Sequence, residues 1–439
     1  MTQSRRTFLR GTAGLCLAAP IAACESRAET VVSSKEGTAP RAAVKASVYV
    51  PGYFPQAAYA NGVAVANNRR LSKAVRNQDE PFRMLTRIDM DGQIRQALLP
   101  AYAHDVKISP DRRLGVLCGF EERNQVAFDP DTLELVAEAP TFAEGWRGGG
   151  HAQFVDGGKT VLLSERAPLA TLKPGAPEAL FGRITIRDAD TLALKGSYST
   201  HGIDPHDIRL IEDGRYLVVA NYGSVIKPGE TEFSVPRHVV QACVTVIDMT
   251  DGRLVDKQVT NRGDAELRHL AAGAQDRIFA IQARLGDDAA GTAAMRSRDA
   301  AYRADITSER GMHYLSAATL KCEVGKPPRA MGRKAEQAQM RHGLSIAYDA
   351  EHDQAIATFP SADRVMVFDG ASGEVVQQID TTRSGLRYPC GVTLLPDGKH
   401  YAVTGYWENL FVYERGSHRL VRDLCLYPMF FGHSHITAA

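Results

Sequence analysis

The chain has 439 residues and a formal net charge of +1, from 52 basic and 51 acidic side chains. This balance gives no reason to expect a nucleic acid as a partner, nor binding driven by one broad basic face. Hydrophobic residues make up 44% and charged residues 23%, which is ordinary for a soluble globular protein, and only the N-terminus carries a notable apolar run.

The first residues have the pattern of an export signal. Arg5 and Arg6 stand directly before Thr-Phe-Leu and a short apolar run, which is typical of a twin-arginine signal. The run ends in Ile-Ala-Ala-Cys, which resembles a bacterial lipobox. Cys24 is therefore the expected site of lipidation, and ordinary cleavage after a small residue is the alternative.

Composition divides the chain into three parts. Residues 1–24 are the expected signal, and residues 25–46 are polar and rich in Ala and Ser, which suits a flexible tether. Residues 47–439 are expected to form one domain. We expect this domain to be periplasmic and to meet the membrane only through a lipid anchor.

One pattern recurs through the expected domain: an apolar run, a polar turn with Asp or Gly, and a second apolar run. It is clear at 106–119, 208–221 and 392–405, and two further strand-like runs follow in most units. Helical periodicity is almost absent outside 333–340. Four antiparallel strands repeated every ~45–70 residues predict an all-β protein, a seven-bladed β-propeller.

The blade count rests on the first strand of each unit. Units begin near residues 104, 151, 206, 269, 342 and 391. A seventh begins at 432–439 with one strand only, and its partners are expected within 62–102. The C-terminal strand would then join the N-terminal blade and close the ring, which removes open sheet edges. Six or eight blades are the alternatives, and long insertions are expected at 223–238 and 285–313.

Histidine recurs at one position of this repeat, just before the innermost strand. Five units carry it there: His104, His151, His206, His269 and His342. The sixth unit has Cys390, and the seventh has His433 and His435. With 13 histidines in 439 residues, chance would place fewer than one at seven given positions. The histidines therefore belong to the repeat.

Two interpretations of these histidines are open. In WD-repeat propellers a Gly-His pair at this place hydrogen-bonds within its own blade, and 149–151 and 432–433 look similar, although the Trp-Asp ending is absent. Alternatively, the side chains line one mouth of the central channel. Imidazoles with Cys390 would then offer nitrogen and sulfur to iron, copper or zinc, or face a haem.

On the binding interpretation, three or four histidines could hold one ion, but separate blades keep all of them from doing so. Asp204 and Asp207 would fix a ring tautomer from behind, and turn formation is their alternative role. His201 is a further candidate for the channel mouth. A lactonase-like hydrolase is a third possibility, but no GxSxG or clustered carboxylates support it, so we predict no catalytic residue and expect a binding protein rather than an enzyme.

Several stretches also resemble one bacterial family. "THGIDPHDIRLIEDGRYLVVANYG" (200–223), "GGGHAQFV" (148–155), "ELRHLA" (266–271) and "PCGVTLLPDG" (389–398) are similar to a domain of unknown function found in twin-arginine-exported, YVTN-like, seven-bladed propellers. The resemblance spans about 100–410. Relatives tend to carry Asn where this chain has His342, so that histidine is a local variation.

The resemblance implies a periplasmic location and an iron-related role, because genes of the family often lie near imelysin-type and other iron-uptake genes. It implies no catalytic residue. The sequence thus predicts a propeller that binds a metal or metal-bearing ligand, with iron favoured over copper or haem, as an accessory to uptake beside periplasmic iron-uptake proteins. The alternative is a scaffold that docks a partner protein and whose histidines are structural.

Overall fold

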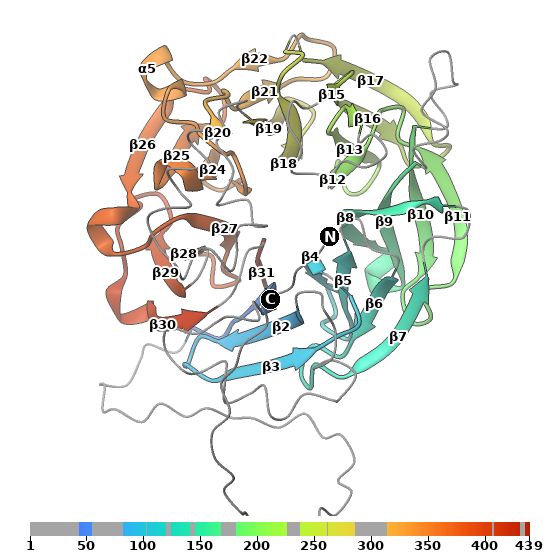
Figure 1. Ribbon diagram of the computed structural model, residues 1–439, viewed down its shortest axis with the longest axis horizontal. Coiled ribbons are helices and arrows are strands. Elements are labelled where there is room, and N and C mark those ends of the chain that lie inside the picture. Colours follow the sequence, from blue (N-terminus) through green and yellow to red (C-terminus); the bar gives the residue numbers. More distant parts are fainter. Residues whose placement is uncertain are drawn as a thin grey trace, which may run out of the picture.

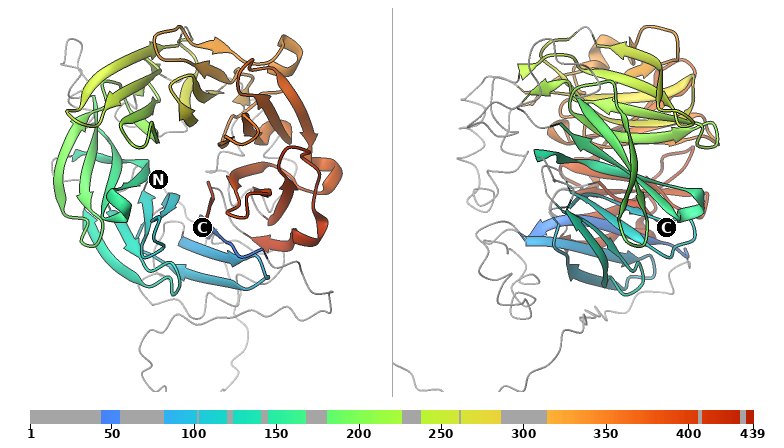
Figure 2. Two further views of the ribbon diagram at one scale, coloured as in Figure 1. Left: turned by 180° about the vertical axis from the view of Figure 1, so that it is seen from behind. Right: turned by 90° about the vertical axis from the view of Figure 1, so that its right-hand side faces the viewer.

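Seven antiparallel sheets form a closed ring in the computed structural model of the protein (Figure 1). The structure describes residues 44–54, 82–101, 103–119, 124–140, 145–167, 181–225, 238–260, 262–285, 314–405, 408–430 and 435–439. The same circular order of sheets is seen from behind in Figure 2. The prediction of an all-β, seven-bladed propeller is therefore confirmed.

The blades follow one another in chain order. Blade 1 contains β1 (Ser47–Phe54), β2 (Phe82–Asp89), β3 (Ile94–Leu98) and β31 (Thr437–Ala438). Blade 2 contains β4 (Ala103–Ile108), β5 (Gly115–Gly119), β6 (Asn124–Phe128) and β7 (Leu135–Pro140). Blade 3 contains β8 (Arg147–Val155), β9 (Thr160–Arg166), β10 (Gly182–Asp188) and β11 (Leu194–Ser199). Blade 4 contains β12 (Pro205–Ile211), β13 (Tyr216–Asn221), β16 (Cys243–Asp248) and β17 (Arg253–Val259).

The remaining blades keep the same order of strands. Blade 5 contains β18 (Glu266–Ala274), β19 (Arg277–Leu285), β21 (Leu320–Cys322) and β22 (Arg329–Ala330), with β20 (Tyr314–Leu315) on β19. Blade 6 contains β23 (Ile346–Asp349), β24 (Gln354–Phe359), β25 (Arg364–Asp369) and β26 (Val375–Asp380). Blade 7 contains β27 (Pro389–Leu394), β28 (His400–Gly405), β29 (Glu408–Glu414) and β30 (Leu426–Phe430). Two elements lie outside the blades. One is a two-stranded ribbon of β14 (Ser224–Val225) and β15 (His238–Val239), and the other is the short helix α5 (Lys334–Gln337).

The hydrophobic core is divided into clusters that lie between neighbouring blades. Val116 of β5, Ala152 of β8 and Val161 of β9 belong to one cluster, which joins blades 2 and 3. Strands β5 and β9 are buried along their whole length, because one face of each sheet is covered by the preceding blade and the other by the following blade. The sequence of these strands therefore shows continuous apolar runs rather than a strict alternation of apolar and polar residues.

The ring closes where the last strand joins the first. In β31, Ala438 pairs with Val48 and Thr437 pairs with Tyr49, both in β1. Closure by the C-terminal strand is thus confirmed (Figure 1). The expected partners within 62–102 are present in the same blade as β2 and β3, but the strand directly paired with β31 is β1. Residues 55–81 lie outside the described residues.

Several expected segments lie outside the part of the chain that the structure describes: the signal with Arg5, Arg6 and Cys24, most of the tether, and the insertions at 226–237 and 286–313. Within the described ranges, none of the helices combines the length and apolar character that crossing a bilayer requires.

Candidate metal centre

Three histidines of the repeat lie at local irregularities of the innermost strands. The register of β4 with β5 shifts between Ala103 and Asp105, so that His104 lies at a bulge. His151 and His206 lie within similar shifts in β8 and β12. A bulge turns a side chain out of the regular alternation of the strand. Here it lets the imidazole leave the regular alternation of its own sheet.

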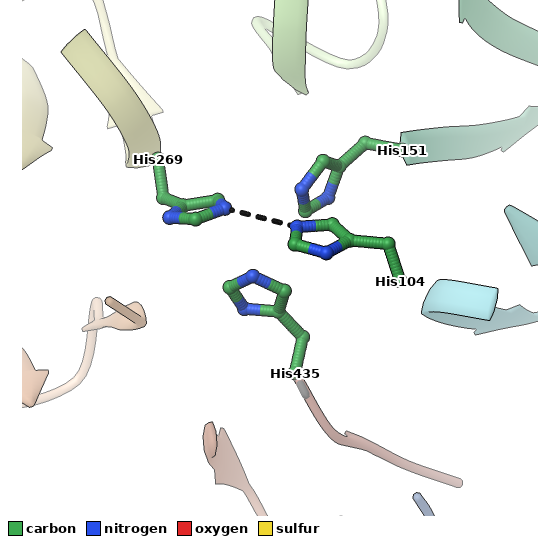
Figure 3. A group of neighbouring side chains, drawn as sticks. All are labelled: His104, His151, His269 and His435. Atoms are coloured by element: carbon green, nitrogen blue, oxygen red, sulfur yellow. Dashed lines mark hydrogen bonds between the residues drawn. The ribbon is translucent and has the colours of Figure 1, made fainter. Parts of the chain in front are cut away.

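Five imidazoles from five blades meet as a result. Figure 3 shows four of them, His104, His151, His269 and His435, pointing toward one another. One ligand atom from each of these four lies within 4.8 Å of the others. His206 joins them, and the ring centroids of contacting pairs among the five are 4.1 to 5.7 Å apart. We call these five residues the histidine cluster.

Three Nε2 atoms of the histidine cluster lie close enough to share one ion. Nε2 of His206 is 3.1 Å from Nε2 of His104 and 2.8 Å from Nε2 of His269, and His104 and His269 are 3.4 Å apart at the same atoms. Nitrogen ligands at about 2.0–2.1 Å from a metal are about 3.4 Å apart in a tetrahedron and about 2.9 Å apart at right angles. The observed spacings span these values.

Hydrogen bonds at the far side of His151 fix its tautomer. Its Nδ1 lies 2.8 Å from Oδ2 of Asp105 and 3.2 Å from Oδ1 of Asp207, which come from the two neighbouring blades. Carboxylates accept, so Nδ1 carries the proton and Nε2 of the neutral ring keeps its lone pair. This Nε2 is buried and has no hydrogen-bond partner within the described residues. A metal ion would accept the lone pair of this nitrogen.

The tautomer of His206 is fixed in the same way by the backbone. Its Nδ1 donates to the carbonyl oxygen of Gly149 at 2.5 Å, and a carbonyl only accepts. Glycine is required there, because a Cβ at position 149 would lie 2.7 Å from the carbonyl oxygen of Pro205. Nε2 of neutral His206 therefore also presents a lone pair to the cluster.

The two carboxylates behind His151 share a sequence pattern. His104-Asp105-Val106-Lys107 and His206-Asp207-Ile208-Arg209 both read His-Asp-apolar-basic. Each basic side chain pairs with the Asp two residues before it: Nζ of Lys107 with Oδ2 of Asp105 at 2.8 Å, and Nη1 of Arg209 with Oδ1 of Asp207 at 2.5 Å. Asp105 was not predicted, although the repeat of this pattern is the signal that would have found it.

Burial favours the neutral form of two of the cluster histidines. It lowers the pKa of His206 and His269 well below the usual imidazole range, and the neighbouring histidines lower it further. Burial alone would raise the pKa of Asp105, but Lys107 and His151 beside it hold the pKa well below its usual range. Nε2 of His151 and Nε2 of His206 thus present lone pairs to the cluster, an arrangement that a cation would stabilise.

Two predicted residues are not brought to the cluster. His342 has a left-handed backbone (φ 60°) and precedes the start of β23 at Ile346 by several residues, so it is not aimed like the others. Its ring stacks on Tyr314 at 3.7 Å, and its Nδ1 lies 2.9 Å from the hydroxyl of Tyr388. Cys390 is buried with Leu344 and Tyr388, and its Sγ lies 3.3 Å from the carbonyl oxygen of Tyr388.

The other predicted positions also have different surroundings. Asp204 forms a buried ion pair with Arg166 through Nε and Nη2, whereas Asp207 does lie behind the cluster, against His151 rather than His206. His201 is half-buried, and its Nε2 donates to the carbonyl oxygen of Gly252 at 3.2 Å. His433 lies outside the described residues.

The fold and the site together define a seven-bladed β-propeller with an imidazole cluster at its axis. Residues 97–424 match the family described as "Protein of unknown function (DUF1513)". This match covers well over half of the chain, and the protein belongs to that family, as the motifs of blades 3, 4, 5 and 7 indicated. No curated protein sequence matches the chain.

Two solved structures are similar to the chain at low sequence identity, and the first of them supports the fold alone. A hydrazine synthase chain from Kuenenia stuttgartiensis is similar with a TM-score of 0.51 and 14% identity, over 76% of this chain and 92% of that chain. A functionally unknown protein from Desulfotomaculum acetoxidans has a TM-score of 0.44 and 9% identity, over 70% of this chain and 78% of its own.

Proposed function

We propose that this protein binds a first-row divalent transition metal ion at the histidine cluster and serves as a periplasmic accessory to metal uptake. The convergence of five imidazoles from five blades carries the proposal. Structural histidines would be turned into their own blades, as the scaffold alternative requires. Instead, these rings contact one another across blades.

The donor set narrows the class of metal. Within the described residues, the group of side chains that could hold an ion consists of histidines. The carboxylates contact the far nitrogen of His151, and Cys390 packs away from the cluster. Imidazole suits iron, copper, zinc and nickel, whereas magnesium and calcium take oxygen ligands. Rings only 4.1 to 5.7 Å apart leave no space for a porphyrin between them, which favours a bare ion over haem.

Iron is the favoured cargo because of the family resemblance, whereas copper would bind a nitrogen site more tightly in a direct competition. The experiment is elemental analysis of protein purified from the periplasm of iron-, copper- and zinc-supplied cells. We expect about one equivalent of metal in the wild type and at least a tenfold loss in His104→Ala and His206→Ala. His201→Ala, a half-buried histidine outside the cluster, is the matched control.

Metal-free wild-type protein, or equal metal content in His206→Ala and wild type, would refute metal binding. The uptake role has a separate test. A deletion strain should grow more slowly under metal limitation, and wild-type protein but not His206→Ala should restore growth. Equal growth of deletion and parent strains at every metal concentration would count against uptake, whatever the protein binds.

Export is part of the proposal and rests on the sequence of the first 24 residues. Changing Arg5 and Arg6 together to Lys should retain the protein in the cytoplasm, because the twin-arginine route reads both side chains. Cys24→Ala should leave export intact and release the protein from the membrane fraction. Fractionation and mass spectrometry of the mature N-terminus measure both effects.

A further inference from the structure

The segment that closes the ring also carries one of the cluster histidines. Residues 435–439, which we call the closing segment, contain His435 and strand β31. The ring of His435 lies 4.1 Å from His269, 4.8 Å from His104 and 5.0 Å from His151, measured between centroids. These partners belong to blades 5, 2 and 3. One short segment therefore reaches residues on three other blades.

The backbone of the closing segment holds few hydrogen bonds to blade 1. β31 is only two residues long and pairs with β1 at two positions. The amide of Ser47 donates to the carbonyl oxygen of Ala439 at 2.8 Å, and the amide of Ala439 donates to the carbonyl oxygen of Ser47 at 2.9 Å. Each such bond contributes little net stability, because water replaces it when the strand leaves.

Side chains add contacts with two further blades. Ile436 is 4% exposed and packs in the core with Val48 of β1 and Leu410 of β29. The hydroxyl of Thr437 donates to the carbonyl oxygen of Val106 in β4 at 2.5 Å. These contacts join blades 1, 2 and 7, but they must offset the conformational entropy lost when the segment becomes ordered.

We infer that a metal ion at the histidine cluster locks the ring closed by binding His435, so that metal binding and ring closure stabilise each other. The inference rests on the proposed function. A ligand that binds only the closed state favours that state, and by linkage anything that favours closure strengthens metal binding. The cluster histidines on blades 2 to 5 would hold an ion less tightly when the closing segment is away.

Hydrogen exchange on the full chain, with zinc as the probe, tests this. Zinc should slow exchange of the amides of Ala438 and Ala439 at least tenfold in the wild type, and much less in His435→Ala. Zinc affinity of His435→Ala should fall by about 10–100-fold. If His435→Ala does not fold, His435→Gln retains more of the side-chain volume and serves the same comparison.

Thr437→Val supplies a readout that loss of a ligand cannot produce. It removes the bond to Val106 and leaves every histidine in place. Because the coupling is reciprocal, zinc should bind this variant about 5-fold more weakly or worse. Thr250→Val removes a similar bond to Asp248 in an outer turn and should leave zinc affinity unchanged.

The outcomes separate the two proposals. Tight zinc binding by the wild type, with unchanged exchange at Ala438 and Ala439 and normal affinity in Thr437→Val, overturns the lock and leaves metal binding intact. Failure of the wild type to bind zinc, iron or copper overturns both. Slowed exchange in the wild type together with weaker binding in Thr437→Val supports the lock.

Discussion

Nδ1 of His151 lies 2.8 Å from Oδ2 of Asp105, a carboxylate of the preceding blade. Asp207 of the following blade approaches the same nitrogen at 3.2 Å. One imidazole is thus held between carboxylates from both neighbouring sheets, with its other nitrogen directed into the histidine cluster. This arrangement would orient His151 as a ligand of the proposed metal ion and raise the basicity of its Nε2.

Asp105→Asn should weaken metal binding by about 10–100-fold without unfolding the protein. The amide oxygen can still accept from His151, but the negative charge that stabilises a bound cation is lost. Titration calorimetry with zinc measures the effect. Asp251→Asn, an exposed carboxylate on blade 4, is the control. Equal affinity in Asp105→Asn and wild type would show that the carboxylate has no part in metal binding.

His342→Ala and His269→Ala should have opposite effects on metal and stability. His342→Ala removes the stack on Tyr314 and the bond to Tyr388, at a cost of about 2–4 kcal/mol in the free energy of unfolding, and leaves metal content unchanged. His269→Ala should lose metal. Urea unfolding and elemental analysis on both variants check this, and loss of metal from folded His342→Ala would contradict our assignment of the cluster.

Asp204→Ala should destabilise the protein by about 3–5 kcal/mol, because it leaves Arg166 buried without its carboxylate partner. The metal content of the folded fraction should stay at the wild-type level. Thermal unfolding and metal analysis of the same preparation provide both numbers. If metal is lost while stability hardly changes, Asp204 has the supporting role that the sequence suggested.

The metal-free protein should lose stability as the pH falls below about 6.5. The folded pKa of His206 and His269 is lowered by burial, so the unfolded chain binds more protons than the folded one in this range. Asp105, whose folded pKa is also lowered, adds a loss only below about pH 4.

Urea midpoints at pH 8.0, 6.5 and 5.5 measure this dependence. Replacing His206 and His269 together by Asn should flatten the curve between the last two points, because both titrating groups are gone. A wild-type midpoint that is the same at all three values would contradict the claim that these imidazoles are held neutral.

The architecture could be predicted from the sequence because a propeller repeats one local pattern. The starts of the units near 104, 206 and 391 agree with β4, β12 and β27, since each begins with an apolar run before a polar turn. The partner of β31 was harder to find. β1 directly follows the segment expected to be a tether, and it pairs with β31 at the other end of the chain. No local sequence pattern indicates such a pairing.

The candidate site could be predicted only in part. The repeat brought His104, His151, His206, His269 and His435 together as candidates, but it could not distinguish them from His342 and Cys390. The difference lies in the backbone: bulges turn His104, His151 and His206 toward the axis, whereas His342 has a left-handed backbone and contacts Tyr388. Bulges and turns of this kind depend on the whole sheet, not on spacing.

X-ray absorption spectroscopy of the wild-type protein loaded with one equivalent of zinc tests the histidine cluster most directly. We expect four or five nitrogen ligands at about 2.0–2.1 Å, with the outer-shell scattering of imidazole rings. A sulfur ligand at about 2.3 Å, or a shell of oxygen without imidazole scattering, would contradict an ion held by His104, His151, His206, His269 and His435.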